Sequence, residues 1–211
     1  MTPKPSSPGP VVVLVNLKGG TGKTTLATHV AEDLKAHLVD LDPQGDANDW
    51  AARSGIVTAS QAHGWEDALE LVEEARQKGP VVVDCPPGEG PALRAALSVA
   101  TVAVIPAKGS MQDLRAVGRM MALAAEARNQ GNPSLKVGLV LNEARSITSM
   151  GEVAEDALEK VQGAHYLGHV GLRTALVEAF ANGATVHSGP ARKDMKAIFE
   201  NLHRLIRSNK P

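Results

Sequence analysis

The sequence predicts one α/β domain in which a mostly parallel, twisted sheet is flanked by helices on both faces. Short runs of β-branched residues alternate with longer segments of helical periodicity along the chain. The valine-rich runs are continuous, as in strands that are covered on both faces. Strands separated by helices pair in parallel, because each helix returns the chain to the same edge of the sheet. A length of 211 residues without an obvious linker fits one domain.

The first half of the chain contains the clearest elements. Residues 11–17 (VVVLVNL) are predicted to form a buried strand, and 24–36 a helix whose apolar residues recur every four positions. A second strand is expected at 37–42, and a helix at 65–79 that ends at a glycine. The segment 80–88 (PVVVDCPPG) is interpreted as a strand that two prolines terminate.

The second half continues this alternation, with a weaker pattern towards the C-terminus. Strands are predicted at 101–107 and 135–142, and helices at 111–130 and 151–162. The elements expected after these are a short strand near 166–170, a helix near 172–181 and a C-terminal helix at 191–207. Strands and helices therefore alternate over nearly the whole chain.

The composition excludes several classes of protein. The chain is 43% hydrophobic and 21% charged, as in soluble globular proteins, and its net charge of -1 does not by itself indicate nucleic-acid binding. The single cysteine, Cys85, rules out an internal disulfide and suits a reducing compartment. No apolar run approaches the roughly 20 residues of a membrane span. Residues 1–10 contain four prolines and no apolar stretch, which predicts a disordered tail rather than a signal peptide.

A glycine-rich segment, 16–25 (NLKGGTGKTT), joins the first strand to the first helix. Its glycines leave room for backbone N–H groups to surround phosphate oxygens, and the helix that follows directs its positive end at the same anion. Lys23 can reach the β- and γ-phosphates of ATP, and the Thr24 hydroxyl can coordinate Mg²⁺. The alternative, a chance glycine-rich turn, does not explain the strand–loop–helix context. The residues predicted to bind ATP or ADP here are Lys18, Gly19, Gly20, Thr21, Gly22, Lys23, Thr24 and Thr25.

The segment contains a second lysine, and it departs from the common motif. Leu17 stands where that motif has glycine, and Lys18 follows it directly. The pattern Lys-Gly-Gly, two residues, Lys-Thr resembles the deviant phosphate loop of the ParA/MinD family of ATPases, over an expected domain at 11–208. In that family the early lysine reaches the ATP of a dimer partner, so the resemblance implies that Lys18 acts in trans in an ATP-sandwich homodimer. From its position alone, Lys18 is better interpreted as an exposed, solvated lysine at a strand end, and the full motif context favours the trans role instead.

Two further segments resemble the family. Residues 39–50 (VDLDPQGDANDW) match its Asp-x-Asp-Pro-Gln-Gly motif, which implies that Asp42 positions the attacking water and helps to hold the metal shell. Asp46 and Asn48 would then belong to a loop that responds to the γ-phosphate, whereas Asp40 reads as a structural carboxylate at a strand end. Asp84, at the end of a valine-rich strand, can hold a water of the Mg²⁺ shell.

The remaining family positions are assigned with alternatives. Cys85 reads as a small buried residue, and it is too isolated to be the iron–sulfur ligand of a nitrogenase iron protein. The segment 104–116, with Pro106 and Asp113, resembles a part of the family that forms the interface. Asn142 falls where family members read the adenine edge, a role that an amide suits, although an asparagine can simply close a strand.

The C-terminal helix suggests what the ATPase acts on. Its apolar residues at helical spacing favour packing on the sheet over membrane insertion. The basic residues expected to contact DNA are Arg173, Arg192, Lys193 and Lys196. Contacts of this kind give salt-sensitive binding to duplex DNA without sequence preference, and no aromatic platform for single strands is visible.

The combined prediction is a compact ParA-type partition ATPase that is cytoplasmic and associated with the nucleoid. ATP binding closes the dimer on DNA, and a centromere-binding or cargo adaptor protein stimulates hydrolysis, which segregates plasmid DNA. Three alternatives remain: an ATPase that positions a protein cargo such as a carboxysome, a MinD-like membrane ATPase, and a small-molecule ATP-dependent ligase of related fold. A bacterial tyrosine kinase is disfavoured because Tyr166 is the single tyrosine.

Overall fold

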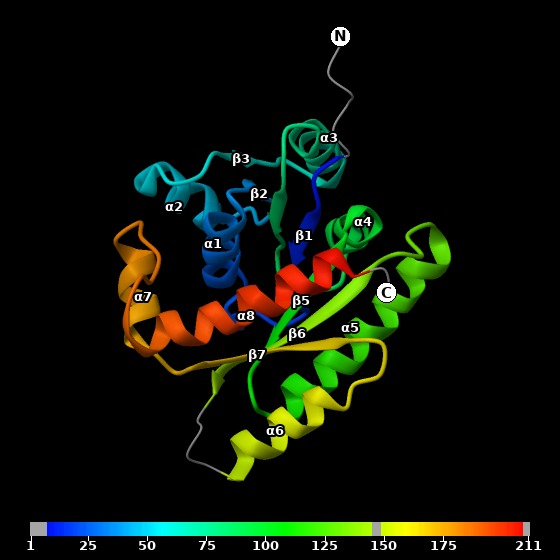
Figure 1. Ribbon diagram of the computed structural model, residues 1–211. Coiled ribbons are helices and arrows are strands. Elements are labelled where there is room, and N and C mark those ends of the chain that lie inside the picture. The colour runs from blue at the N-terminus through cyan, green and yellow to red at the C-terminus, as the bar shows by residue number, and fades with distance from the viewer. Residues whose placement is uncertain (1–7, 145–148, 209–211) are drawn as a thin grey trace.

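The computed structural model describes residues 8–144 and 149–208 and contains a seven-stranded sheet (Figure 1). The strands are β1 (Val11–Leu14), β2 (His37–Asp40), β3 (Ala59–Gln61), β4 (Val81–Asp84), β5 (Val102–Ala107), β6 (Lys136–Ala144) and β7 (His165–Gly171). Their order in the sheet is β3-β2-β4-β1-β5-β6-β7, and every pairing is parallel. The predicted fold class is confirmed.

Two helical layers cover the two faces of this sheet. The helices are α1 (Lys23–Leu34), α2 (Asp46–Ser54), α3 (Trp65–Arg76), α4 (Pro91–Val99), α5 (Met111–Gln130), α6 (Ser149–Glu159), α7 (Thr174–Ala181) and α8 (Gly189–Arg207). One apolar cluster joins α3, α4, α5 and α6 to the sheet, and a second joins α1, α2, α7 and α8 to the other face. In Figure 1 α1, α2 and α7 lie to the left of the sheet and α8 crosses in front of it, whereas α4 and α5 lie to its right.

Three elements were not predicted, and each has a weak local pattern. α2 contains only three buried residues among polar neighbours, and one of them, Trp50, is fully buried through long-range contacts such as its indole N–H to Ala184 O. β3 is three residues long and partly exposed. α4 follows a Gly-Pro turn and begins with Pro91, a residue that favours the first turn of a helix.

The last residues of the segment that was predicted to be a disordered tail are ordered. Residues 1–7 lie outside the described part of the chain. Gly9 is fixed, because its N–H donates to Arg76 O at 2.7 Å, and Pro10 O accepts the N–H of Val81 at 2.9 Å. The prediction of a disordered tail is therefore wrong for residues 9 and 10, which lead directly into β1.

The C-terminal helix is anchored to the sheet at its apolar face and at its end. Six apolar side chains of α8 are at most 4% exposed: Ala191, Met195, Ile198, Phe199, Leu202 and Leu205. The ammonium of Lys136, at the start of β6, donates to the carbonyls of Leu205, Ile206 and Ser208 at 3.1, 3.0 and 2.7 Å. A cation suits the negative end of a helix, so Lys136 caps α8 and holds it on the sheet.

Candidate functional site

The phosphate loop lies at the carboxyl end of β1, next to the point where the strand order changes direction. Gly20 and Gly22 have φ values of 68° and 92°, in the left-handed region that favours glycine. A Cβ at position 22 would lie 2.2 Å from Asn142 Nδ2, so space as well as conformation requires glycine there. α1 begins at Lys23 immediately after this turn, which directs the positive end of the helix towards the loop.

A cavity of about 440 Å³ opens on this loop. That volume lies within the range of about 300–1,000 Å³ that small-molecule sites occupy. The predicted site residues that line the cavity are Gly19, Gly20, Gly22, Lys23, Thr24, Thr25, Asp42, Asn142 and Arg173. Thr21 and Asp84 are each 1% exposed and lie beneath this surface. The fold thus gathers residues from four separate segments at one edge of the sheet.

Asp84 is a buried carboxylate with one oxygen that lacks a partner. Its Oδ1 has no hydrogen bond among the described residues. Burial raises the pKa of Asp84 to about 7, although a hydrogen bond from Thr24 and the charge of Lys23 both favour the carboxylate. A cation beside Thr24 and Asp84 would compensate this buried oxygen and favour its charged form.

These residues therefore fit the Mg²⁺ ion that phosphate loops use with ATP. Among the described residues, no group of three His, Cys, Asp or Glu side chains is arranged to hold a metal by itself. Mg²⁺ keeps several waters and binds through one or two protein groups together with phosphate oxygens, and Thr24 and Asp84 are groups of the right kind.

Asp40 and Asp42 have different roles in the turn after β2. Asp40 is fully buried, and its two oxygens accept the N–H groups of Asp42 at 3.0 Å and Asn48 at 2.9 Å. Asp40 is therefore a structural carboxylate, as predicted, because its hydrogen bonds fix the turn after β2. Asp42 instead lines the cavity. The expectation that Asp46 and Asn48 lie in a loop is wrong, because both lie in the first turn of α2.

Gln61 on β3 supports the same turn, and it was not among the residues expected from the sequence. Its amide Nε2 lies 3.1 Å from Asp40 O and 3.0 Å from Asp42 O. These contacts hold the backbone on both sides of Leu41 and so limit where the Asp42 carboxylate can point. No local pattern identifies this residue, because β3 itself has no strand periodicity.

Replacing Gln61 by glutamate should slow ATP hydrolysis without removing ATP binding. The substitution keeps the shape but puts a carboxylate oxygen against two carbonyls, so the turn that carries Asp42 shifts. We expect kcat to fall about tenfold, as misplacement of a catalytic group does, while ATP affinity changes less than about threefold. Steady-state kinetics and fluorescent-nucleotide titration measure the two quantities. Gln77→Glu, the same change at an exposed residue after α3, is the control, and a wild-type kcat in Gln61→Glu would refute this role.

Lys18 is held within its own chain by a buried carboxylate. Its Nζ lies 2.7 Å from Oδ1 of Asp113, and the side chains are 43% and 2% exposed, respectively. Burial alone would raise the pKa of Asp113, but hydrogen bonds from Lys18 and Ser110 lower it below its usual value. Asp113 also completes a capping box with Ser110 at the start of α5, so the acceptor of Lys18 is rigid.

Comparison with known proteins places this site in a family. The model of the CobQ/CobB/MinD/ParA nucleotide binding domain matches residues 12–186. The chain belongs to this family. Nucleotide binding and, at the level of the family, ATP hydrolysis follow from that membership and agree with the phosphate loop and its cavity.

Individual members of the family resemble the chain over most of its length. Maintenance of carboxysome distribution protein A from Halothiobacillus neapolitanus is 30% identical over 191 residues, which cover 86% of this chain and 88% of that protein. Chromosome-partitioning ATPase Soj from Thermus thermophilus is 29% identical over 163 residues, or 60% of this chain and 66% of Soj. A putative plasmid partition protein from Borrelia burgdorferi bound to AMPPNP shares the fold, with a TM-score of 0.76, 14% identity and coverage of 93% and 99%.

Asn142 and a set of apolar residues line the cavity together with the phosphate loop. Asn142 Nδ2 donates to Thr21 O at 2.8 Å, so this family member uses the amide to brace its phosphate loop. Its adenine-reading role stays a prediction. Leu172 and Val177 are 58% and 71% exposed, and both line the cavity, a feature that no sequence pattern indicates.

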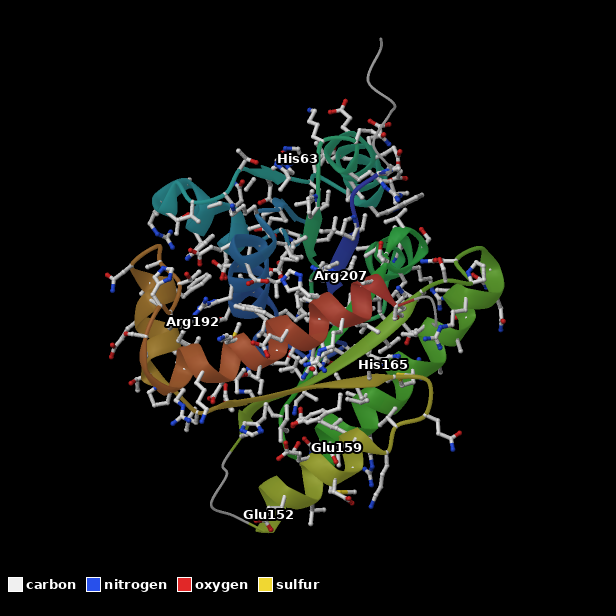
Figure 2. The ribbon with its side chains drawn as sticks, in the orientation of Figure 1. His63, Glu152, Glu159, His165, Arg192 and Arg207 are labelled. Atoms are coloured by element: carbon white, nitrogen blue, oxygen red, sulfur yellow. The ribbon has the colours of Figure 1, made fainter. Side chains whose placement is uncertain are left out.

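The predicted DNA-contacting residues lie around α7 and the start of α8. Arg173 is 3.4 Å from Asp194, and it lines a hollow of about 660 Å³ beside β7 together with Lys193. Arg192 packs its guanidinium over the ring of Phe199, at 5.8 Å from the centroid (Figure 2). The Nζ of Lys196 lies 3.9 Å from Glu200. The four side chains thus lie on the α7–α8 side of the molecule, and their binding to DNA remains a prediction.

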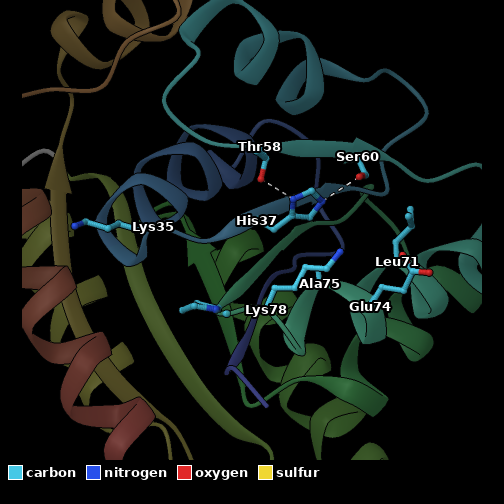
Figure 3. Close-up of a pocket in the computed structure, with 10 residues that line it drawn as sticks. Lys35, His37, Thr58, Ser60, Leu71, Glu74, Ala75 and Lys78 are labelled. Atoms are coloured by element: carbon cyan, nitrogen blue, oxygen red, sulfur yellow. Dashed lines mark hydrogen bonds between the residues drawn. The ribbon is translucent and has the colours of Figure 1, made fainter. Parts of the chain in front are cut away.

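A second cavity, of about 280 Å³, lies at the opposite edge of the sheet (Figure 3). His37 occupies its wall and contacts the hydroxyls of Thr58 and Ser60 at 2.8 and 3.0 Å. Burial and the nearby charge of Lys78 lower the pKa of His37, so the ring is neutral near pH 7. The neutral ring joins β2 to the segment that contains β3, which is a structural role.

Proposed function

We propose that the chain is an ATPase that dimerises when it binds ATP, holds duplex DNA without sequence preference and positions a cargo on that DNA. The observation that supports this most is the pairing of Lys18 with Asp113. Lys18 is a cation beside the phosphate loop whose side chain is nearly half exposed, so it can exchange its own carboxylate for an anion on a second subunit. The phosphates of the partner's ATP are the anions that a face-to-face dimer would bring to it.

The residues of the cavity have complementary roles in this proposal. Lys23 and the N–H groups of the loop bind the phosphates, while Thr24 and Asp84 orient the metal shell. Mg²⁺ held there would supply positive charge against the phosphate oxygens. Asp42, held in place by Asp40 and Gln61, orients the attacking water.

The nature of the cargo is the finer part of the proposal. The sequence alone favours plasmid DNA bound by a centromere-binding partner. The similarity to the carboxysome distribution protein supports the alternative of a protein assembly carried through an adaptor. The similarity to Soj supports a DNA cargo. Both possibilities share the ATP-dependent dimer and its binding to duplex DNA, and they differ in the cargo and in the adaptor protein that links the cargo to the dimer.

The MinD-like membrane alternative receives no support from α8. A membrane-binding helix must present its apolar face to lipid, and here that face is buried in the sheet. The Lys136 cap holds the end of the helix in place. Within the described residues, no helix has the length and apolar character needed to cross a bilayer.

Co-sedimentation with duplex DNA, with ADP, with ATP and without nucleotide, tests the DNA proposal. We expect binding with ATP alone, and a weakening as salt rises. Lys193→Glu/Lys196→Glu should weaken DNA binding. It should also reduce the slope of log binding constant against log salt concentration by about 0.9 for each phosphate that is no longer neutralised. The control Lys78→Glu/Lys160→Glu makes the same change in net charge on exposed lysines elsewhere and should leave binding unchanged. Equal weakening by both pairs, or nucleotide-independent binding, would contradict the proposal.

A further inference from the structure

The carboxyl end of β6 contains a distorted residue beside the nucleotide cavity. Glu143 has a φ of 53°, and among the described residues Lys35 is the only other non-glycine residue with a positive φ. The pairing of β6 with β7 also shifts its register between Asn142 and Ala144, so Glu143 lies in a bulge. A side chain makes the left-handed conformation unfavourable, and residues that keep it cluster at functional sites.

The bulge brings two consecutive side chains to the same cavity. In a regular strand, neighbouring side chains point to opposite faces of the sheet, so Asn142 and Glu143 would point away from each other. In this chain both residues line the nucleotide cavity. The distortion therefore adds a carboxylate to the part of the cavity that already contains the amide of Asn142.

An ion pair holds this carboxylate and offsets its charge. Nζ of Lys108, in the loop after β5, lies 2.6 Å from Oε1 of Glu143, and the two side chains are 35% and 41% exposed, respectively. An ionised carboxylate only accepts hydrogen bonds, and it repels the phosphates of a nucleotide. The charge of Lys108 reduces that repulsion, while Glu143 stays exposed enough to accept a hydrogen bond from a ligand.

The phosphate loop determines which part of a nucleotide can reach Glu143. Phosphates bound by Lys23 and the N–H groups of the loop leave the nucleoside to the other residues of the cavity. Asn142 is the residue predicted to read the adenine edge. Four apolar side chains of the cavity suit the faces of a base: Leu172, Leu176, Val177 and Phe180. The donors left for a carboxylate are therefore the hydroxyls of the ribose.

We propose that Glu143 binds the ribose hydroxyls and makes the cavity select ribonucleotides over deoxyribonucleotides. The two hydroxyls lie on neighbouring carbons, so one carboxylate can accept hydrogen bonds from both, as acidic residues do for the ribose in dinucleotide-binding folds. A deoxynucleotide would leave the carboxylate without these donors. The proposal rests on the proposed function only for nucleotide binding in this cavity, and it needs neither the dimer nor DNA.

Isothermal titration calorimetry with Mg²⁺ and unlabelled ADP, 2′,3′-dideoxy-ADP or IDP tests this proposal. We expect the wild type to bind ADP at least about tenfold more tightly than the dideoxy analogue, since hydrogen bonds to a charged group are lost. Glu143→Gly should bind both with nearly equal affinity, because its affinity for ADP falls and that for the analogue does not. Glycine accepts the left-handed φ, so the bulge keeps its backbone. Glu143→Gln should give an intermediate ratio, because a neutral acceptor is weaker.

Two further variants serve as matched controls. Asp156→Asn removes a carboxylate from another lysine pair, 2.7 Å long and on α6. Asp46→Asn removes a different carboxylate that lines the same cavity. Both should keep the wild-type ratio of affinities for ADP and dideoxy-ADP.

Three results would overturn the role of Glu143. The first is an equal ratio in the wild type and Glu143→Gly, and the second is a loss of the ratio in Asp46→Asn instead. The third is a change in the preference for ADP over IDP, which lacks the adenine amine, with the dideoxy ratio unchanged, because Glu143 would then contact the base. A wild type that binds none of the three nucleotides would contradict the nucleotide site itself, and this proposal with it.

Discussion

Lys18→Gln is expected to remain monomeric with ATP and to lose ATP hydrolysis. The substitution removes the charge but keeps a polar side chain, so the phosphate loop of the same subunit is unaffected. A cation supplied in trans to a transferring phosphoryl group contributes about 10³–10⁵ to the rate, so hydrolysis should fall to background. Sedimentation velocity with ATP measures the dimer, and fluorescent-nucleotide titration should show that each monomer still binds ATP.

Asp113→Asn separates the trans role of Lys18 from its ion pair within the chain. Asparagine can still accept the N–H of Ser110 and so preserve the start of α5, but it no longer holds Lys18 by charge. We expect this variant to dimerise with ATP at least as well as the wild type, because Lys18 is free to contact a partner. If Asp113→Asn failed to dimerise, as Lys18→Gln is expected to fail, then dimerisation would depend on the ion pair between Lys18 and Asp113 within one chain and not on a contact of Lys18 across the interface.

Asp84→Asn is expected to stabilise the nucleotide-free protein above pH 7 while it impairs catalysis. The pKa of Asp84 is about 7 in the fold, mainly because of burial, and its ordinary value is 3.8, so the folded state binds the extra proton between these values. The free energy of unfolding of the wild type therefore falls as pH rises from about 4 to 7. In Asp84→Asn this contribution is absent, because the amide of asparagine does not titrate. The shift corresponds to a stabilisation of on the order of 2–4 kcal/mol at pH 8.

Urea denaturation at pH 5 and pH 8 without nucleotide or Mg²⁺ measures this effect. The stability advantage of Asp84→Asn over the wild type should be clearly larger at pH 8 than at pH 5, because only part of the fall between pH 4 and pH 7 has occurred at pH 5. The same variant should lose Mg²⁺-dependent hydrolysis, because the amide cannot supply the charge that orients the metal shell. An identical stability difference at the two pH values would show that Asp84 does not titrate in this window.

The phosphate loop was predictable because its chemistry is local. The glycines, Lys23 and Thr24 lie within ten residues, and their spacing predicts both the conformation of the loop and its phosphate ligand. The strand before the loop and the helix after it are predicted from apolar periodicity. The same holds for the buried valine-rich strands and for the apolar face of α8. These features depend on residues that are close together in the sequence, so one sequence is enough to predict them.

Contacts between distant segments could not be predicted in this way. The partner of Lys18 is 95 residues away, and Asn142 braces a carbonyl 121 residues away. Gln61 acts from a strand of three residues that has no periodicity. α2 was missed because Trp50 is buried by residues near 184, not by its own neighbours. The roles of these residues arise from the packing of the sheet.

A crystal structure of the protein with Mg²⁺ and a non-hydrolysable ATP analogue tests the central claim most directly. We expect a dimer in which Nζ of Lys18 has left Asp113 and contacts a phosphate oxygen bound to the other subunit. A structure in which Lys18 remains on Asp113 of its own chain, with the analogue bound and no phosphate of a second subunit near it, would contradict the trans role of Lys18.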